Sequence, residues 1–252
     1  MNPDFRLHFI PAPEPLTDFV ESIGMFHNIS DNEAREVVVL PDGRIDLFFW
    51  QTADQPFQIF LIGLETAPEQ RSVPPQTRAF VISFKPLAVE YILKESISNL
   101  LNTAKILQSG FWDFTAEDLD GFDAFYQKIT KTVTSLLPSA IDERKRKLFG
   151  DIYASKGEMS VKQLSENAAW TSRQINRYFN QQFGLSLKVY CNILRFRASL
   201  PHIADGKLFP ELNFSDQNHF IKEIKKFSGV VPAKLNKNEN DRFILLSVLK
   251  QQ

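Results

Sequence analysis

The chain has 252 residues, of which 43% are hydrophobic and 23% are charged, and its formal net charge is −1. This length suits one large globular domain or two ordinary ones, and the apolar fraction can supply a core. No basic segment followed by an apolar stretch comes after Met1, and no run of about 18 apolar residues occurs, so we expect no export, no membrane span and a cytoplasmic location. The one cysteine, Cys191, excludes an internal disulfide and a cysteine-based zinc site, and we expect it to be a small core residue.

The charge is distributed unevenly along the chain. Residues 151–252 carry 15 basic and 9 acidic side chains, whereas residues 1–150 carry 14 basic and 21 acidic ones. A basic C-terminal part favours polyanions because binding releases counterions, and an acidic N-terminal part repels them. A basic excess of this size is also common on surfaces that bind no nucleic acid, so charge alone leaves the question open.

The first hundred residues are short apolar runs separated by Pro and Gly, which predicts an antiparallel β-rich domain. Residues 37–40 and 44–50 flank the turn signal Pro41-Asp42-Gly43, and this arrangement predicts a β-hairpin. The second run alternates as a half-buried strand does, with Ile45, Leu47 and Phe49 against Arg44, Asp46 and Phe48. We expect Arg44 and Asp46 to form a surface pair, and the alternative is that they belong to a pocket.

Helical patterning begins at "LAVEYILKESISNLL" (residues 87–101) and continues through "FDAFYQKITKTVTSLL" (residues 122–137). Pro138 ends it, because proline is not compatible with a helix interior. "DERKRKLF" (residues 142–149) then begins another helix with a charged outer face.

The segment "SVKQLSENAAWTSRQINRYFNQQFGLS" (residues 160–186) contains two helix-start signals. Ser160 with Gln163, and Thr171 with Gln174, have the form of capping boxes. They predict short helices over about 161–167 and 172–183 with a tight turn between them, which is a helix-turn-helix. The second helix would project from the surface, where it can enter a major groove about 12 Å wide.

A second copy of this helix follows 45 residues later, in "FSDQNHFIKEIKKFSG" (residues 214–229). Ile175 and Phe179 of the first copy fall on Phe220 and Ile224 of the second. "SLKVYCNILRFRASLPHI" (residues 186–203) has helical spacing and predicts a helix that connects the two copies. Arg can bridge guanine, and Asn or Gln can bridge adenine, so both copies carry residue types that read base edges. Such residues also occur on exposed helices that bind nothing, and the repeat is what favours DNA recognition.

These elements, together with "NFSDQNHFIKEIKKFSGVVPAKL" (residues 213–235), resemble the AraC/XylS family of bacterial transcription regulators over about 85 residues. The resemblance implies two helix-turn-helix units whose recognition helices enter successive major grooves on one face of DNA. It also implies the base or phosphate contacts, which are Arg173, Gln174, Asn176 and Arg177 in the first unit and Gln217, Asn218, His219 and Lys222 in the second.

The sequence departs from the family pattern at two places. Ala169 and Asn213 stand where the family usually has the glycine of the tight turn. Alanine in a left-handed conformation costs on the order of 1 kcal/mol, so we expect the first turn to be built differently. Pro210 lies where the first helix of the second unit should run, and we expect that helix to be reduced to a stub around Glu211 and Leu212.

The N-terminal part resembles, less specifically, the cupin-like sensor domains of this family, through "VVLPDGRIDLFF" (residues 38–49) and "AFVISFKPLAVEYIL" (residues 79–93). The resemblance implies that this part binds a small effector or mediates dimerisation. The histidines have no metal-ligand spacing, and neither a phosphate loop nor a G-x-S-x-G motif occurs, so we expect no metal, no cofactor and no catalytic residue. The residues that would bind an effector are not identified by the sequence.

The predicted fold class is α+β, with a β-rich, cupin-like sensor or interaction domain in residues 1–104, a helical linker region in 105–150, and an all-α DNA-binding domain with two helix-turn-helix units in 151–252. The predicted function is that of a sequence-specific, effector-responsive transcription regulator, not an enzyme. Its predicted partner is double-stranded DNA, with a small-molecule effector, RNA polymerase and a second copy of the chain as further candidates and no membrane. The alternative is a cupin-like small-molecule-binding protein or enzyme whose C-terminal helices are a protein-interaction module.

Overall fold

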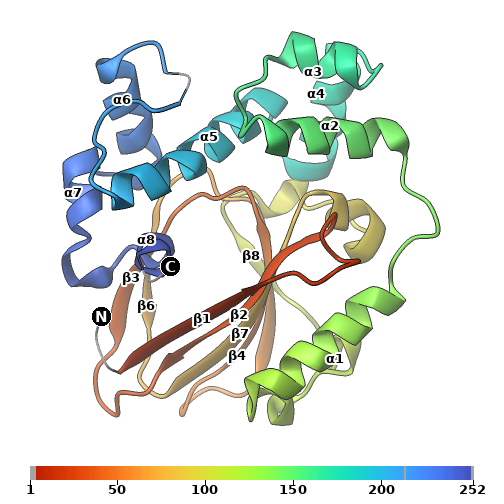
Figure 1. Cartoon of the computed structure of the whole chain (residues 1–252). Helices are drawn as coiled ribbons and strands as arrows, with labels where there is room; N and C mark the ends of the chain where they lie inside the picture. Colours follow the sequence, from red (N-terminus) through yellow and green to blue (C-terminus); the bar gives the residue numbers. More distant parts are fainter. Residues whose placement is uncertain (1–3, 213, 251–252) are drawn as a thin grey trace.

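The computed structural model of the chain describes residues 4–212 and 214–250. Its N-terminal part is built of strands (Figure 1). A six-stranded antiparallel sheet has the order β1-β2-β7-β4-β5-β8, and β3 pairs with β6 in a separate two-stranded sheet. The bounds are β1 Phe5–Pro11, β2 Val20–Asn28, β3 Arg35–Val39, β4 Ile45–Gln51, β5 Gln58–Ile62, β6 Glu69–Val73, β7 Thr77–Phe84 and β8 Ala104–Ile106.

Alternation along the strands gives the large sheet two covered faces. On one face the fully buried Phe49 packs against Phe125 of α1 (Phe122–Ser135), with ring centroids 5.0 Å apart. On the other face Phe26 packs with Val37 of β3 and Val73 of β6 in a second, smaller cluster. The predicted alternation of β4 is therefore confirmed, and residues of both alternating sets are covered.

The predicted β-hairpin at Pro41-Asp42-Gly43 is wrong. β3 pairs with β6, whereas β4 pairs with β5 and β7, so the turn is a corner between two sheets. Gly43 has a left-handed φ of +78°, and a Cβ there would come within 2.9 Å of Leu194 in the helical part. The close packing of Gly43 against the helical part is thus a tertiary contact that accompanies its role as a corner between two sheets.

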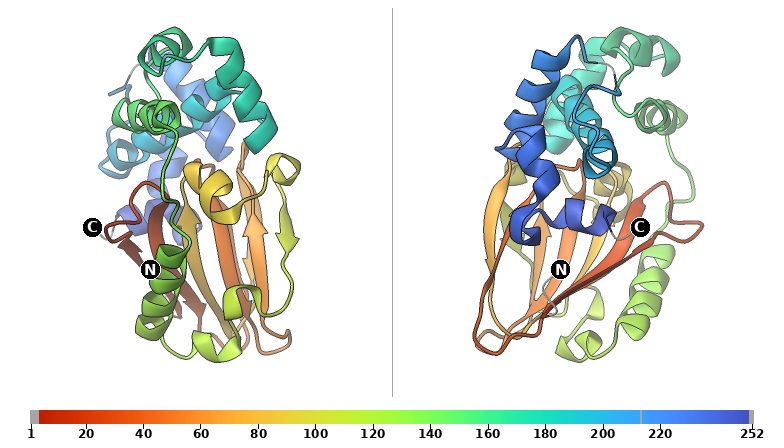
Figure 2. Two further views of the ribbon diagram at one scale, coloured as in Figure 1. Left: turned by 90° about the vertical axis from the view of Figure 1, so that its right-hand side faces the viewer. Right: turned by 60° about the vertical axis from the view of Figure 1, so that its left-hand side comes forward.

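The C-terminal part is helical, and its long helix α5 crosses it (Figures 1 and 2). The helices are α2 Glu143–Ala154, α3 Val161–Asn167, α4 Ser172–Phe183, α5 Leu187–Ala204, α6 Gln217–Ser228, α7 Pro232–Lys237 and α8 Ile244–Leu249. The predicted fold class, with a β-rich N-terminal part and a helical C-terminal part, is confirmed. None of the helices in the described ranges is long and apolar enough to cross a bilayer.

The segment predicted to begin helical patterning, residues 87–101, contains only short turns. A π-helical turn at Val89–Leu93 ends at Lys94, which has a left-handed φ of 56°, and a 3-10 turn follows at Ser98–Leu100. Further 3-10 turns lie at Phe111–Asp113, Ala116–Leu119 and Glu239–Asp241. Residues 87–101 pack between the sheet and the helical part, with Val89 and Ile97 fully buried. Their apolar spacing therefore reflects burial from two sides and not a regular helix.

Candidate nucleic-acid interface

Both helices of the first unit begin where their capping boxes predict. The backbone N–H of Gln163 donates to Ser160 Oγ at 3.2 Å, and the N–H of Ser160 donates to Gln163 Oε1 at 3.1 Å. Thr171 and Gln174 make the equivalent bonds at 3.3 and 3.1 Å. The resulting helices span Val161–Asn167 and Ser172–Phe183, as predicted. Each box satisfies helix N–H groups that would otherwise have no partner.

The tight turn of the first unit is left-handed, contrary to the expectation from its missing glycine. Ala169 adopts a φ of 48°, and it is exposed. Its neighbour Ala168 is buried, and the fully buried Ile175 and Phe179 form the inner face of α4. The inner faces of α3 and α4 hold the turn in a conformation that alanine does not favour.

The outer face of α4 presents two arginines. Arg173 and Arg177 are exposed, and within the described part of the chain neither makes a hydrogen bond or an ion pair. Gln174 is exposed too, but its Oε1 is occupied in the capping box. Asn176 is half-buried: its Nδ2 donates to Ser172 O at 3.0 Å and its Oδ1 accepts from the N–H of Leu187 at 3.3 Å. Asn176 therefore holds the start of α5 against α4.

The second predicted recognition helix, α6, also starts at a cap. Asp216 Oδ1 accepts from the N–H of His219 at 2.8 Å, and this bond lowers the pKa of the Asp216 carboxyl. His219 Nδ1 accepts from the N–H of Ser215 at 3.2 Å, and Gln217 Nε2 donates to Leu208 O at 2.9 Å. Gln217 and His219 thus fix the entry into the helix.

Asn218 and Lys222 point outward from the same helix. Both are exposed, and the described residues offer neither side chain a hydrogen bond or an ion pair. Lys225 and Lys226, in the last turn, are exposed as well. The outer face of α6 therefore presents one amide and three ammonium groups.

The described residues contain no supporting helix for the second unit. Between the end of α5 at Ala204 and the start of α6 at Gln217, the described residues form turns and irregular chain, with no stub at Glu211 and Leu212. Pro210 accounts for this, because it would remove a helix hydrogen bond and clash with the preceding turn. Phe214 instead packs edge-on against Phe220, with centroids 5.2 Å apart. Asn213, the other expected turn residue, lies outside the described residues.

The first unit is attached to the β-rich part at the C-terminal end of α4. The N–H of Ile97 donates to Gln182 O at 2.9 Å, and Ser96 Oγ donates to Gln181 O at 2.6 Å. Tyr178 OH donates to Glu90 Oε2 at 3.2 Å. The sequence pattern gave no sign of these contacts, since they join residues more than 80 positions apart.

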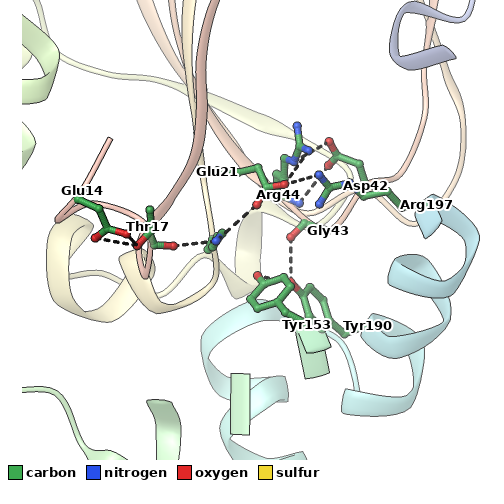
Figure 3. Close-up of polar contacts among 10 residues, drawn as sticks. Glu14, Thr17, Glu21, Asp42, Gly43, Arg44, Tyr153, Tyr190 and Arg197 are labelled. Carbon is green, nitrogen blue, oxygen red and sulfur yellow. Dashed lines mark hydrogen bonds and ion pairs between the residues drawn. The ribbon is translucent and has the colours of Figure 1, made fainter. Parts of the chain in front are cut away.

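A second joint connects the β-rich part to α5 (Figure 3). Glu21 of β2 accepts hydrogen bonds from Arg197 of α5 and from Arg44 at 3.2 Å. It also forms an ion pair with Lys85, whose Nζ lies 3.6 Å away. Arg44 is only 13% exposed, so the predicted surface position of this side chain is wrong. Each arm of the network belongs to a different strand, turn or helix, which explains why sequence spacing did not reveal it.

Two phenols extend this joint. Tyr190 OH of α5 donates to Gly43 O at 3.1 Å, and Tyr153 OH lies 3.0 Å from Tyr190 OH (Figure 3). Burial raises the pKa of both phenols, so both keep their protons. A hydrogen bond thereby links the corner at Pro41-Asp42-Gly43 to α5, the helix that connects α4 and α6.

Comparison with known proteins gives one family and a small set of solved structures. Residues 8–105 match a family described as a domain of unknown function (DUF6597). No curated protein matches the chain. The chain is similar to the crystal structure of ToxT from Vibrio cholerae O395, at 9% identity and a TM-score of 0.47 over 93% of this chain and 97% of that one. A second ToxT structure from Vibrio cholerae gives 12% identity and a TM-score of 0.41 over 92% and 97%.

The class that fold and site define is a two-part protein, with a β-rich N-terminal part attached to a helical part in which two capped helices, α4 and α6, are joined by α5. Its N-terminal 8–105 segment matches the DUF6597 family. The helices α3, α4, α5 and α6 agree with what the resemblance of the C-terminal motifs to the AraC/XylS family implies, whereas the described residues contain no supporting helix before α6.

Proposed function

We propose that the protein is a sequence-specific, double-stranded-DNA-binding transcription regulator of the AraC/XylS type. The observation that carries this proposal is the repeat: α4 and α6 each begin at a side-chain cap, each bury one apolar face, and each present unpaired polar and basic groups outward. α5 joins them, and both lie above the sheet in the view of Figure 1.

The two helices have different roles in this proposal. Arg173 and Arg177 of α4 can bridge guanine or hold phosphates, because their guanidinium groups are free in the protein. Asn218 of α6 can bridge adenine, and Lys222 can neutralise a phosphate. The caps and the amide of Asn176 position these side chains.

The N-terminal part serves as the sensor in this proposal. Residues 1–104 form the sensor domain, 105–150 the linker region and 151–252 the DNA-binding domain. Support comes from the two joints, which connect the β-rich part to α4 and to α5. A change in the sensor domain can thus alter the geometry of both recognition helices. RNA polymerase and a second copy of the chain are further proposed partners.

Fluorescence anisotropy with labelled duplexes from the region upstream of the protein's own gene tests DNA binding. We expect an affinity that falls steeply with the logarithm of salt concentration, since each neutralised phosphate releases counterions. Arg177→Ala should lower both the affinity and the salt slope, whereas Lys131→Ala, which removes an exposed charge from α1, should change neither. If the wild type binds no duplex at low salt, with or without candidate effectors, the C-terminal helices are an interaction module and the proposal is wrong.

A further inference from the structure

A cavity of about 680 Å³ lies between the large sheet and the helical part. Its floor is the sheet face that carries Phe48 and Val81, and its roof is made by α5 and α8, with Leu194 and Val248 among the lining residues. This volume is in the range of pockets that enclose small organic molecules.

One end of the cavity is apolar. Phe26 and Phe48 lie with ring centroids 5.7 Å apart, and Val39, Ile244 and Leu249 complete this end. The apolar surface comes from four separate elements, which are β2 and β4 in the large sheet, β3 beside it, and α8. This end of the cavity can contact the apolar body of a ligand, and its named residues offer that body no polar partner.

The other end has a row of polar residues on three neighbouring strands. Ser83 of β7 is paired with Asp46 of β4 on one side and with Ser22 of β2 on the other. Asp46 Oδ1 and Ser22 Oγ are buried and have no hydrogen-bond partner among the residues that the structure describes. A buried polar atom without a partner costs roughly 1–3 kcal/mol, so these two atoms mark where a ligand's polar group would be stabilised.

The charges at this end favour a neutral ligand. Glu21 is already surrounded by Arg44, Lys85 and Arg197. A ligand carboxylate beside Asp46 would meet the nearby carboxylate of Asp42, whereas a ligand ammonium would meet the guanidinium of Arg44, since both groups act on Asp46. Lys156, the remaining cation of the lining, is exposed. An uncharged head group avoids both repulsions.

The burial of Asp46 also favours an uncharged ligand head group. Removal from water raises the pKa of the Asp46 carboxyl to about 7, with the nearby Asp42 adding to the effect and the Ser83 hydrogen bond and Arg44 opposing it. A carboxyl that is partly protonated near neutral pH pairs well with a neutral hydroxyl or amide, since either can accept and donate.

We propose that this cavity binds an uncharged amphiphile, whose apolar body lies against Phe26 and Phe48 and whose head group offers an O–H or N–H donor to Asp46 and a second polar atom to Ser22. The inference rests on the proposed regulatory function in one respect: the bound amphiphile is its effector. Because α5 and α8 form the roof, occupancy alters the support of the helix that connects α4 and α6.

Isothermal titration calorimetry on the full chain, with three ten-carbon probes, tests the site. 1,2-Decanediol is neutral, decanoate is anionic and decylammonium is cationic. We expect the diol to bind at least tenfold more tightly than either ion. Asp46→Ala and Val81→Trp, which remove the acceptor and fill the apolar end, should each weaken diol binding at least tenfold, and Asp54→Ala on the exposed β4–β5 loop should leave it unchanged.

Circular dichroism shows whether each variant is folded, and Ser22→Ala gives a third, smaller change at the same site. Tighter binding of either ion, diol binding that resists all three variants, or no binding of any probe would each overturn the proposal. DNA is absent from the titration, so a protein that binds the diol but no duplex would refute the regulatory function and leave the site intact. A protein that binds duplex but not the diol would refute the amphiphile site and leave the regulatory function intact.

Discussion

Ala169→Gly should stabilise the protein, because Ala169 holds a left-handed φ of 48° in the turn between α3 and α4. The left-handed conformation costs a residue with a Cβ about 1–2 kcal/mol, and glycine adopts it without that cost. Ala169 is exposed, so the substitution removes little buried surface. We expect the free energy of unfolding to rise by about 1 kcal/mol after glycine's larger unfolded-state entropy is deducted. For a chain of this size that corresponds to a rise in Tm of about 2–4 °C.

The assay is differential scanning calorimetry with urea unfolding in parallel, and the matched control is Ala154→Gly. Ala154 is also exposed, but it is the last residue of α2, so there glycine should lower the stability because it is a poorer helix former than alanine. Opposite signs for the two variants are the expected result. An Ala169→Gly variant that is unchanged or less stable would show that the turn is not left-handed at this position.

Three further results are expected. The folded pKa of Asp46, about 7, lies above its unfolded value, so the wild type loses stability as pH rises from 4 to 7. Asp46→Asn lacks this loss and should therefore gain stability relative to wild type over that window, by roughly 4 kcal/mol at most. Urea titrations at several pH values that give a constant difference would contradict this. Cys191 is 5% exposed and burial raises its pKa to about 12, so an aromatic disulfide reagent at pH 8 should label it slowly in the native protein and rapidly in urea, and equal rates would be inconsistent with the buried position. Asn176→Ala should lower Tm because two internal hydrogen bonds are lost, whereas Asn218→Ala should leave Tm unchanged. If instead Asn218→Ala lowers Tm and Asn176→Ala does not, Asn176 is the residue of the two that is assigned to base contacts.

The parts of the fold that the sequence predicted best are those fixed by local interactions. The starts of α3 and α4 follow from capping boxes, in which both partners lie within four residues of each other. Pro210 predicted that the supporting helix of the second unit is shortened, but the predicted stub at Glu211 and Leu212 is not a helix in the structure. The alternation in β4 likewise predicted which residues share a face.

The parts that could not be predicted depend on contacts between distant segments. Pro41-Asp42-Gly43 has the composition of a hairpin turn, and composition does not tell which strands then pair. Arg44 and Asp46 alternate with apolar residues, which places them on the other face of β4 but does not show that α5 and α8 cover that face. The Glu21 network and the unpaired Asp46 Oδ1 depend on how these distant elements pack together, which sequence spacing does not determine.

Hydroxyl-radical footprinting on a duplex that the protein binds tests the central claim, that α4 and α6 are two recognition helices. We expect two protected segments on one face of the DNA, about 10 base pairs apart, because helices that enter successive major grooves are separated by about one helical turn. With each protein added to saturation of the duplex, Arg177→Ala should weaken one segment, and Lys222→Ala should weaken the other. A single protected segment, or a uniform loss of both segments in either variant, would contradict the account.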